Sequence, residues 1–180
     1  SFCILQTEVP TDCLIEAARI SRARGIRTVL KPATSGALPE ELIKNIDILI
    51  PNQNELADIC PGKGSMEEQA KSLLLMGAGT VIVTLGDQGC YMVSADSEKY
   101  YPAQDFDAID ASGACDAFIS SLVSYLIYGY DMDKAIRISH YAAGFSVTRQ
   151  GVIPSLIDRN SLESYIRQRE PELLEKQRSE

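Results

Sequence analysis

The chain has 180 residues, of which 45% are hydrophobic and 23% are charged, and its formal net charge is −8. This length and composition predict one ordinary globular domain with a full core, and they exclude a disordered or fibrous chain. The acidic balance argues against a nucleic-acid or anionic-membrane binder, because such proteins need basic patches to neutralise phosphates. No apolar run approaches the roughly 18 residues that would span a bilayer.

Five widely spaced cysteines and a single histidine restrict the chemistry further. The number of cysteines is odd and no CxxC pair occurs, which argues against the common zinc frameworks and favours a reducing, cytosolic setting. A histidine-dependent catalytic triad could use only His140, so that chemistry is disfavoured.

The chain opens on SFCILQTEVP, with strand-like residues from Phe2 and no starting methionine. Because natural termini are usually frayed and polar, this opening predicts a fragment whose upstream part is missing. Trimming of a few disordered residues is the alternative.

Short apolar runs alternate with helical patterns in the first half of the chain, which is typical of βα units and a largely parallel sheet. Strands are expected at 2–5, 26–30, 47–50 and 80–85, and helical segments at 39–46 and 55–59. Thr11 is expected to cap a helix that Gly25 stops. A capping-box pattern at Ser65 and Glu68 opens another helix, which Gly77 closes.

The pattern changes after residue 85. Segments 89–94 and 99–101 flank a polar turn and predict an antiparallel hairpin at one edge of the sheet. Helices are expected from about 113 to 128, from an Asp131 cap to about 148, and from 158 to 168, with breaks at Gly151 and Pro154. The charged tail is predicted to be solvated or weakly helical. The chain is therefore predicted to be one three-layer α/β/α domain, with a mainly parallel sheet and an antiparallel edge hairpin.

Two familiar nucleotide-binding motifs are absent. No GxGxxG follows a predicted strand, which excludes the dinucleotide fingerprint. The segment 61–65 (PGKGS) contains Gly-Lys, but it lacks the earlier glycine and has Gly64 in place of Ser or Thr. It is therefore not a phosphate loop of the Walker type.

The strongest local feature is the stretch 110–118 (DASGACDAF). Small residues lead directly into a helix, so the N–H groups of Gly113, Ala114 and Cys115 can approach an anion closely. The helix dipole would also keep Asp116 ionised. Amides that stabilise a moving phosphoryl group, beside a carboxylate that accepts an alcohol proton, suit phosphoryl transfer. Taken alone, a G-x-x-D helix start is more often a cap with tight packing.

This stretch resembles the GAGD signature of the ribokinase-like (PfkB) family of carbohydrate kinases. Other segments resemble family motifs in order along the chain, and the match covers essentially residues 1–168. QTE at 6–8 resembles a strand end that supplies a sugar-contacting glutamate, and PNQNE at 51–55 resembles the N-x-x-E motif. VTLGDQG at 83–89 resembles the T-L-G-x-x-G strand and turn, and SVTRQGVIPS at 146–155 resembles the V-T-R-x-G-A-x-P-S segment.

The resemblance implies roles at the matching positions. Asp116 would be the catalytic base at the substrate, and Glu8 would contact the sugar, although a strand-end glutamate is commonly just solvated. Asn52 and Glu55 would arrange magnesium and the phosphates. His140 would lie near the adenine, and the alternative is a core-facing or surface position on a helix. The remaining implied residues are Thr84, Gly86 and Gly89 for the nucleotide, and Gly113, Ala114 and Cys115 for the anion hole.

The resemblance also implies cofactors and partners. Ribokinases coordinate a monovalent cation mostly through carbonyl oxygens, and the matching positions here are Asp110, Ser112, Ser146, Arg149, Gly151 and Ser155. The implied cofactors are ATP and Mg²⁺, with K⁺ as the candidate monovalent cation. The implied partners are ATP and a small-molecule sugar, without nucleic acid or membrane, and a homodimer is compatible with the resemblance. The sequence does not decide between ribose, fructose, another sugar or a nucleoside.

The chain departs from the family pattern in three ways. Cys115 occupies the third position of G-A-G-D, so the amide survives but a thiol projects at the phosphate site. Lys31 precedes Pro32 where ribokinases often carry Asn. Family members are nearly twice as long, and their N-terminal half, with the Gly-Gly sugar motifs and a small β lid, has no counterpart here. The chain is therefore predicted to be the ATP-binding, base-bearing half of a cytoplasmic sugar kinase, inactive by itself. The alternative is a non-catalytic nucleotide-binding or sensing module.

Overall fold

The computed structural model describes residues 1–33, 36–62 and 64–175. The chain divides into two compact units, unit 1 (Ser1–Pro102) and unit 2 (Ala103–Glu180). The boundary follows the edge hairpin of the sheet, at a place where the sequence has no long linker.

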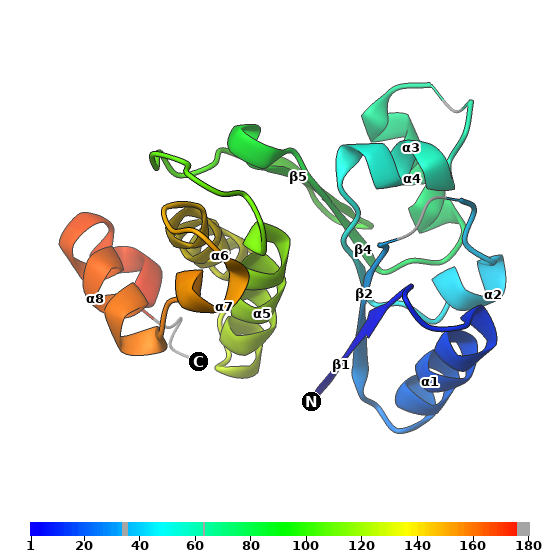
Figure 1. Ribbon diagram of the computed structural model, residues 1–180. Coiled ribbons are helices and arrows are strands. Elements are labelled where there is room, and N and C mark those ends of the chain that lie inside the picture. Colours follow the sequence, from blue (N-terminus) through cyan, green and yellow to red (C-terminus); the bar gives the residue numbers. More distant parts are fainter. Residues whose placement is uncertain (34–35, 63, 176–180) are drawn as a thin grey trace. The chain divides into compact units, whose positions relative to one another are not determined.

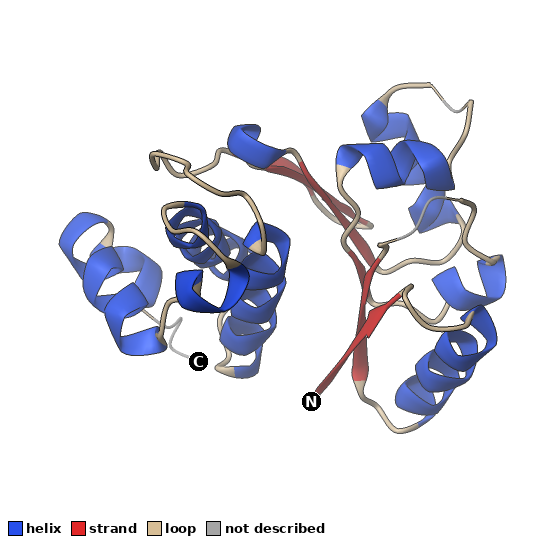
Figure 2. Ribbon diagram, viewed as in Figure 1, coloured by secondary structure: helices blue, strands red, loops and turns tan. Residues whose placement is uncertain are grey.

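Unit 1 is built on a six-stranded sheet in which neighbouring strands follow each other in chain order (Figure 2). The strands β1 to β4 pair in parallel, whereas β4–β5 and β5–β6 pair antiparallel. The predicted mainly parallel sheet and its antiparallel edge hairpin are therefore confirmed. The strands are β1 (Phe2–Gln6), β2 (Arg27–Lys31), β3 (Ile48–Leu49), β4 (Thr80–Thr84), β5 (Cys90–Ser94) and β6 (Glu98–Tyr101).

Four helices lie on one face of this sheet: α1 (Thr11–Ala23), α2 (Glu40–Ile43), α3 (Gln53–Ile59) and α4 (Met66–Leu75) (Figure 1). Their apolar sides and the sheet form one core, which includes Leu14, Leu56, Leu73 and Val81. Three central residues of β4 are fully buried, as its continuous β-branched sequence predicts for an interior strand. The capping box of Ser65 and Glu68 is present at the start of α4.

Three local predictions were wrong. Thr11 is the first helical residue of α1 rather than its cap, because Pro10 is the N-cap residue and no side chain caps this helix. The helix predicted from 55 begins earlier, at Gln53, because Asn52 caps it. Pro154 does not break a helix but lies inside the short helix α7 (Val152–Ser155). A proline is tolerated there because the N–H groups of a first helical turn have no helical acceptor.

Unit 2 is helical. Its long helices α5 (Ala114–Ile127) and α6 (Met132–Val147) pack against each other, and α8 (Arg159–Arg169) follows α7. Asp131 caps α6, as predicted, through its Oδ1 and the Lys134 N–H. The rings of Phe106, Phe145 and Tyr165 pack together, with centroids 4.5–5.8 Å apart, and they fix the loop that precedes α5 to α6 and α8. Among the described residues, no helix is both long and apolar enough to cross a membrane.

Candidate active site

The start of α3 holds the first pair of predicted site residues. The Asn52 Oδ1 accepts a hydrogen bond from the Glu55 N–H over 2.8 Å, and the Glu55 Oε2 accepts one from the Asn52 N–H over 2.7 Å. The two residues therefore form a capping box, and each fixes the orientation of the other. The N-x-x-E spacing in the sequence also indicates a capping box, because it matches an N-cap residue followed three residues later by glutamate.

Lys31, at the carboxyl end of β2, joins this pair. Its ammonium forms an ion pair with both carboxylate oxygens of Glu55 and donates to the Pro32 carbonyl oxygen over 2.7 Å. The side chains of Lys31 and Glu55 are only 9% and 16% exposed. The sequence marked Lys31 as a departure from the family pattern but did not predict its partner, because the contact joins residues 24 positions apart.

The nucleotide strand β4 ends beside the start of α3. Asn52 and Thr84 form an isolated parallel bridge, and the Thr84 N–H donates to the Pro51 carbonyl oxygen over 2.9 Å. Beyond Thr84 the chain turns through Gly86 and Gly89, whose φ angles of 63° and 97° favour glycine. The predicted nucleotide and magnesium residues of unit 1 thus meet at one edge of the sheet, outside the carboxyl ends of β3 and β4. This edge is the usual position of ligands in open α/β sheets.

Glu8 lies at the same edge, because β1 runs parallel to these strands. It follows the carboxyl end of β1, and its side chain is exposed in a turn. It borders a surface depression that Gln6, Val9 and Leu14 also line. The position is compatible both with a sugar contact and with a solvated glutamate, so the role of Glu8 stays a prediction.

The start of α5 in unit 2 carries the predicted anion hole. Gly113 is its N-cap residue with φ 81°, and a Cβ at this position would lie 2.8 Å from the Val152 Cγ1. Ala114, Cys115 and Asp116 form the first turn, whose N–H groups have no acceptor within the helix. The Ala114 N–H donates instead to the Ala111 carbonyl oxygen over 3.3 Å. The Asp116 side chain is exposed in the same turn.

Asp110 holds the loop that leads into α5. Its Oδ2 accepts from the Gly151 N–H over 3.0 Å, and its Oδ1 accepts from the Ser112 N–H over 2.9 Å. These hydrogen bonds, that from Gly151 foremost, lower the pKa of Asp110 to about 2. Three positions predicted for the monovalent cation are thereby brought together.

The other predicted cation positions give less information. The hydroxyls of Ser146 and Ser155 are buried and donate to the carbonyl oxygens of Ala143 and Val152 over 2.8 and 2.7 Å. Arg149 is exposed just beyond the end of α6. Within the described residues, no cluster of three or more His, Cys, Asp or Glu side chains could hold a metal ion.

His140 lies inside unit 2. It is 6% exposed on α6, and its ring centroid lies 5.3 Å from that of Phe118 on α5. Burial lowers its pKa to about 4, so the imidazole is neutral at pH 7. His140 thus occupies a buried position on a helix. A contact with adenine stays a prediction.

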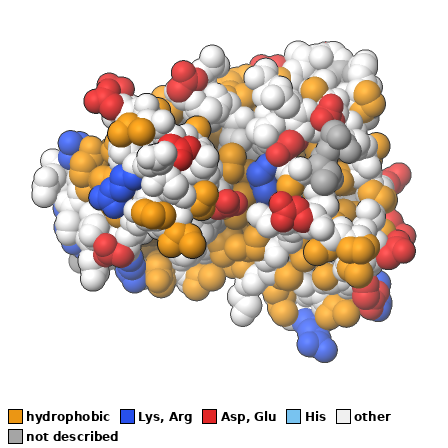
Figure 3. All heavy atoms as spheres, viewed as in Figure 1, with side chains coloured by type: hydrophobic (Ala, Val, Ile, Leu, Met, Phe, Trp, Pro, Cys, Tyr) orange, Lys and Arg blue, Asp and Glu red, His pale blue; other side chains and the backbone are white. Residues whose placement is uncertain are grey.

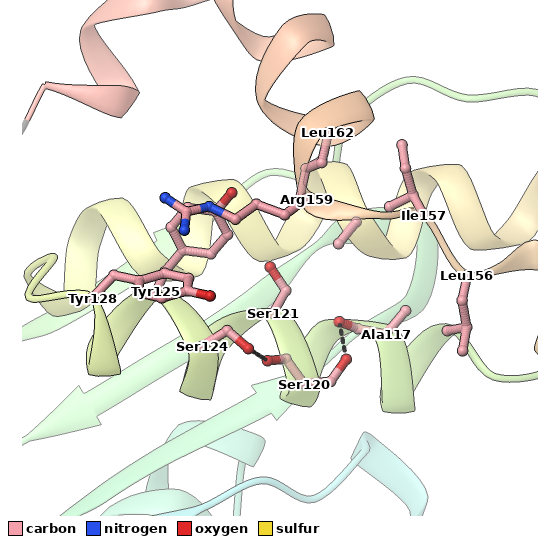
Figure 4. Close-up of a pocket in the computed structure, with 11 residues that line it drawn as sticks. Ala117, Ser120, Ser121, Ser124, Tyr125, Tyr128, Leu156, Ile157, Arg159 and Leu162 are labelled. Carbon is pink, nitrogen blue, oxygen red and sulfur yellow. Dashed lines mark hydrogen bonds between the residues drawn. The ribbon is translucent and has the colours of Figure 1, made fainter. Parts of the chain in front are cut away.

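A separate pocket of about 150 Å³ lies beside α5, and Figure 4 shows its lining. Ser121 lies in its wall, and the Ser121 Oγ is buried without a hydrogen-bond partner in the described part of the chain. Arg159 also lines the pocket, and its guanidinium lies over the Tyr128 ring, 4.0 Å from the ring centroid. None of the predicted site residues lines this pocket, and no motif in the sequence indicated it.

The surface agrees with the acidic composition. On the face shown in Figure 3, Lys and Arg side chains are scattered among acidic and apolar ones and do not gather in one patch.

Comparison with known proteins decides the family. Residues 1–159 match the sequence model of the pfkB family carbohydrate kinases. The chain belongs to this family. It is 37% identical over 161 residues to a ribokinase of Staphylococcus aureus, an alignment that covers 86% of this chain and 53% of that protein. A ribokinase of Haemophilus influenzae is 33% identical, with 87% and 52% of the two chains covered. This PfkB chain thus spans about half the length of the curated relatives it matches.

Solved structures confirm the fold of this PfkB chain. A ribokinase from Thermotoga maritima superposes with a TM-score of 0.86 at 28% identity, covering 93% of this chain and 57% of that one. A ribokinase from Arabidopsis thaliana, solved in complex with ribose and ATP, superposes with a TM-score of 0.85 at 26% identity, covering 89% and 54%. The ribokinase-like α/β fold that the sequence motifs predicted is therefore confirmed.

Proposed function

We propose that the complete protein is an ATP-dependent sugar kinase and that this chain is its ATP-binding, base-bearing half. The observation that carries the proposal is the start of α5 in a chain of the PfkB family. There, Gly113 takes a left-handed conformation that begins the helix, and the first turn presents the Asp116 carboxylate to solvent. A helix start of this kind offers amides to an anion beside a carboxylate that can accept a proton.

The chemistry follows from these two groups. An alcohol oxygen of the sugar attacks the terminal phosphorus of ATP, and Asp116 accepts the proton that the alcohol loses. The bond between that phosphorus and ADP breaks, which gives a sugar phosphate and ADP. The amides at the start of the helix, at Gly113 and Cys115 above all, stabilise the negative charge on the phosphoryl group as it moves.

The residues of unit 1 fit a magnesium–nucleotide complex. Mg²⁺ keeps several waters and is usually held by one or two carboxylates together with substrate phosphates. Asn52 and Glu55 offer oxygens of this kind, but both already accept hydrogen bonds, so they would hold the ion through its water molecules. When bound, Mg²⁺ neutralises charge on the phosphates. Thr84, Gly86 and Gly89 would contact the nucleotide.

The names of the relatives support a sugar as the acceptor. They include ribokinases and a deoxyribokinase of Salmonella typhi, and the Arabidopsis structure holds ribose and ATP. We assign Glu8 and Asp116 to the sugar, and K⁺ to the loop that Asp110 holds. The five cysteines are free thiols, which supports a cytoplasmic enzyme.

Replacement of the base tests the proposal. In the complete protein, Asp116→Asn keeps size and hydrogen bonding but removes the basic oxygen, so kcat should fall by roughly 10²–10⁴-fold while ATP affinity changes little. ADP release with ribose, fructose and a nucleoside as acceptors measures this. Asp12→Asn, at another exposed first-turn aspartate, is the matched control and should leave the rate unchanged.

The outcomes separate the candidate functions. An Asp116→Asn enzyme that retains most of its activity would overturn the base. A wild-type protein that binds ATP but phosphorylates none of the acceptors would favour a nucleotide-sensing module. Residues 1–180 alone should bind nucleotide weakly and phosphorylate no sugar, because phosphoryl transfer depends on positioning both reactants.

A further inference from the structure

The ammonium of Lys31 is fully engaged inside unit 1. It has three N–H donors, and its acceptors are the two carboxylate oxygens of Glu55 and the Pro32 carbonyl oxygen. The side chain is 9% exposed, so water does not replace these contacts readily. Lys31 therefore acts on Glu55, and it could reach a ligand only by giving up one of these contacts.

The Glu55 carboxylate is in turn held from two directions. Lys31 binds both of its oxygens, and the Asn52 N–H donates to Oε2 over 2.7 Å. A carboxylate offers about four acceptor positions, so three are used and one remains, on Oε1. The position that remains can accept a hydrogen bond from a metal-bound water.

The ion pair between Lys31 and Glu55 also sets the charge at this edge of the sheet. Glu55 stands where the family motif places a residue for magnesium and phosphates, beside the bridge between Asn52 and Thr84. An unpaired carboxylate there would repel a triphosphate, because like charges at close range oppose binding. Paired with Lys31, the group is neutral overall.

We propose that Lys31 is a positioning residue for the nucleotide: it fixes the Glu55 carboxylate and cancels its charge, so that the triphosphate is not repelled. The inference rests on the proposed function, since it assumes that ATP binds at this edge. A purely structural ion pair is the competing explanation. A buried pair by itself is weak evidence for stability, because an apolar pair of similar volume often serves as well.

The test compares ATP binding with and without magnesium in the complete protein. Calorimetry gives the Kd for ATP in EDTA, which is the readout for the charge at Glu55, and the Kd for ATP with excess Mg²⁺, which reports the magnesium role of Glu55 separately. Lys31→Met removes the charge and keeps the stem, Lys31→Arg keeps the charge, and Lys31→Met with Glu55→Gln removes both charges. Lys71→Met breaks the exposed ion pair with Glu98 in the same unit and is the control.

In Lys31→Met the unpaired carboxylate repels metal-free ATP, so the Kd in EDTA should rise by roughly 10-fold or more, because like charges at close range oppose binding by at least this much. Lys31→Arg, the double variant and Lys71→Met should keep the wild-type Kd in EDTA. The double variant also lacks the Glu55 carboxylate, so its Kd with Mg²⁺ should be weaker than that of the wild type. An unchanged Kd in EDTA for Lys31→Met, or a double variant whose Kd in EDTA rises as much, would overturn the assignment. If Lys31→Met does not fold, the double variant and Lys31→Arg decide, and a raised Kd in EDTA in either refutes the assignment. A wild-type protein that binds no ATP would refute the proposed function itself.

Discussion

The two units hold their candidate site groups in different ways. In unit 1, side chains hold one another, because Asn52 and Glu55 form a capping box at α3 and Lys31 forms an ion pair with Glu55. In unit 2, the candidate groups are mainly backbone amides, and their position depends on the φ angle of Gly113 and on the hydrogen bonds of the Asp110 carboxylate. The difference predicts that deleting a side chain disturbs the site of unit 1, whereas adding one disturbs the site of unit 2.

The largest expected effect is a loss of stability at low pH, and it comes from His140, which packs against Phe118 on α5. His140 has a pKa of about 4 when folded, against about 6.5 when unfolded, because it is buried. Its contribution to stability is complete above pH 6.5 and is lost as the pH falls towards 4, since the unfolded chain takes up the proton first. This loss amounts to about 3 kcal/mol.

Urea unfolding of the wild type and of His140→Gln at pH 7, 5.5 and 4.5 measures this contribution. The wild type should lose more stability than the variant across this range, and the difference between the two proteins isolates the group. If the stabilities of the two proteins fell in parallel with pH, His140 would not be buried as a neutral imidazole. In that case α5 and α6 would not form a rigid support for the amides.

The next effect comes from adding a side chain at the start of α5. Gly113→Ala forces a left-handed residue to carry a Cβ, which costs about 1–2 kcal/mol, and that Cβ also meets Val152. Gly129→Ala, at the other end of α5, has φ 86° and open space around it, so it is the matched control. Both variants should lose stability, but only Gly113→Ala should lose ATP affinity and kcat as well. Equal kinetic effects in the two variants would show that the backbone at Gly113 does not form the site.

A smaller effect comes from deleting a side chain in unit 1. Asn52→Ala removes the N-cap of α3 and should cost about 1 kcal/mol of stability. Ser65→Ala removes the equivalent cap of α4 and should cost about as much. Because Asn52 also orients Glu55, only Asn52→Ala should weaken MgATP binding, as measured by calorimetry. Weakening of the same size in Ser65→Ala would reduce the role of Asn52 to helix stability.

The smallest effect is expected at Cys115. Cys115→Gly leaves the amide in place and removes the thiol, so kcat should be equal or higher, with a stability loss of a few tenths of a kcal/mol from the lower helix propensity of glycine. Ala114→Gly controls for that propensity. A large fall in kcat for Cys115→Gly alone would show that the thiol, not only the backbone, takes part in the site.

The sequence by itself determined the features that depend on local patterns. The β-branched run of β4, the capping box at Ser65 and the Asp131 cap all form as predicted, because propensity and capping act over a few neighbouring residues. The ordered motifs identified the family for the same reason, since each motif is a short contiguous segment. The start of α1 was misjudged because Pro10 and Thr11 are both acceptable near an N-cap, and a local pattern separates them poorly.

Only the tertiary structure decided which distant residues act together. The contact between Lys31 and Glu55 depends on β2 and α3 reaching one edge of the sheet, and no periodicity in the sequence reports it. The same holds for Asp110 and Gly151, which are 41 residues apart. The burial of His140 against Phe118 also follows from how α5 and α6 pack. Such pairings depend on chain folding over long separations, whereas the sequence encodes directly only what neighbouring residues do to each other.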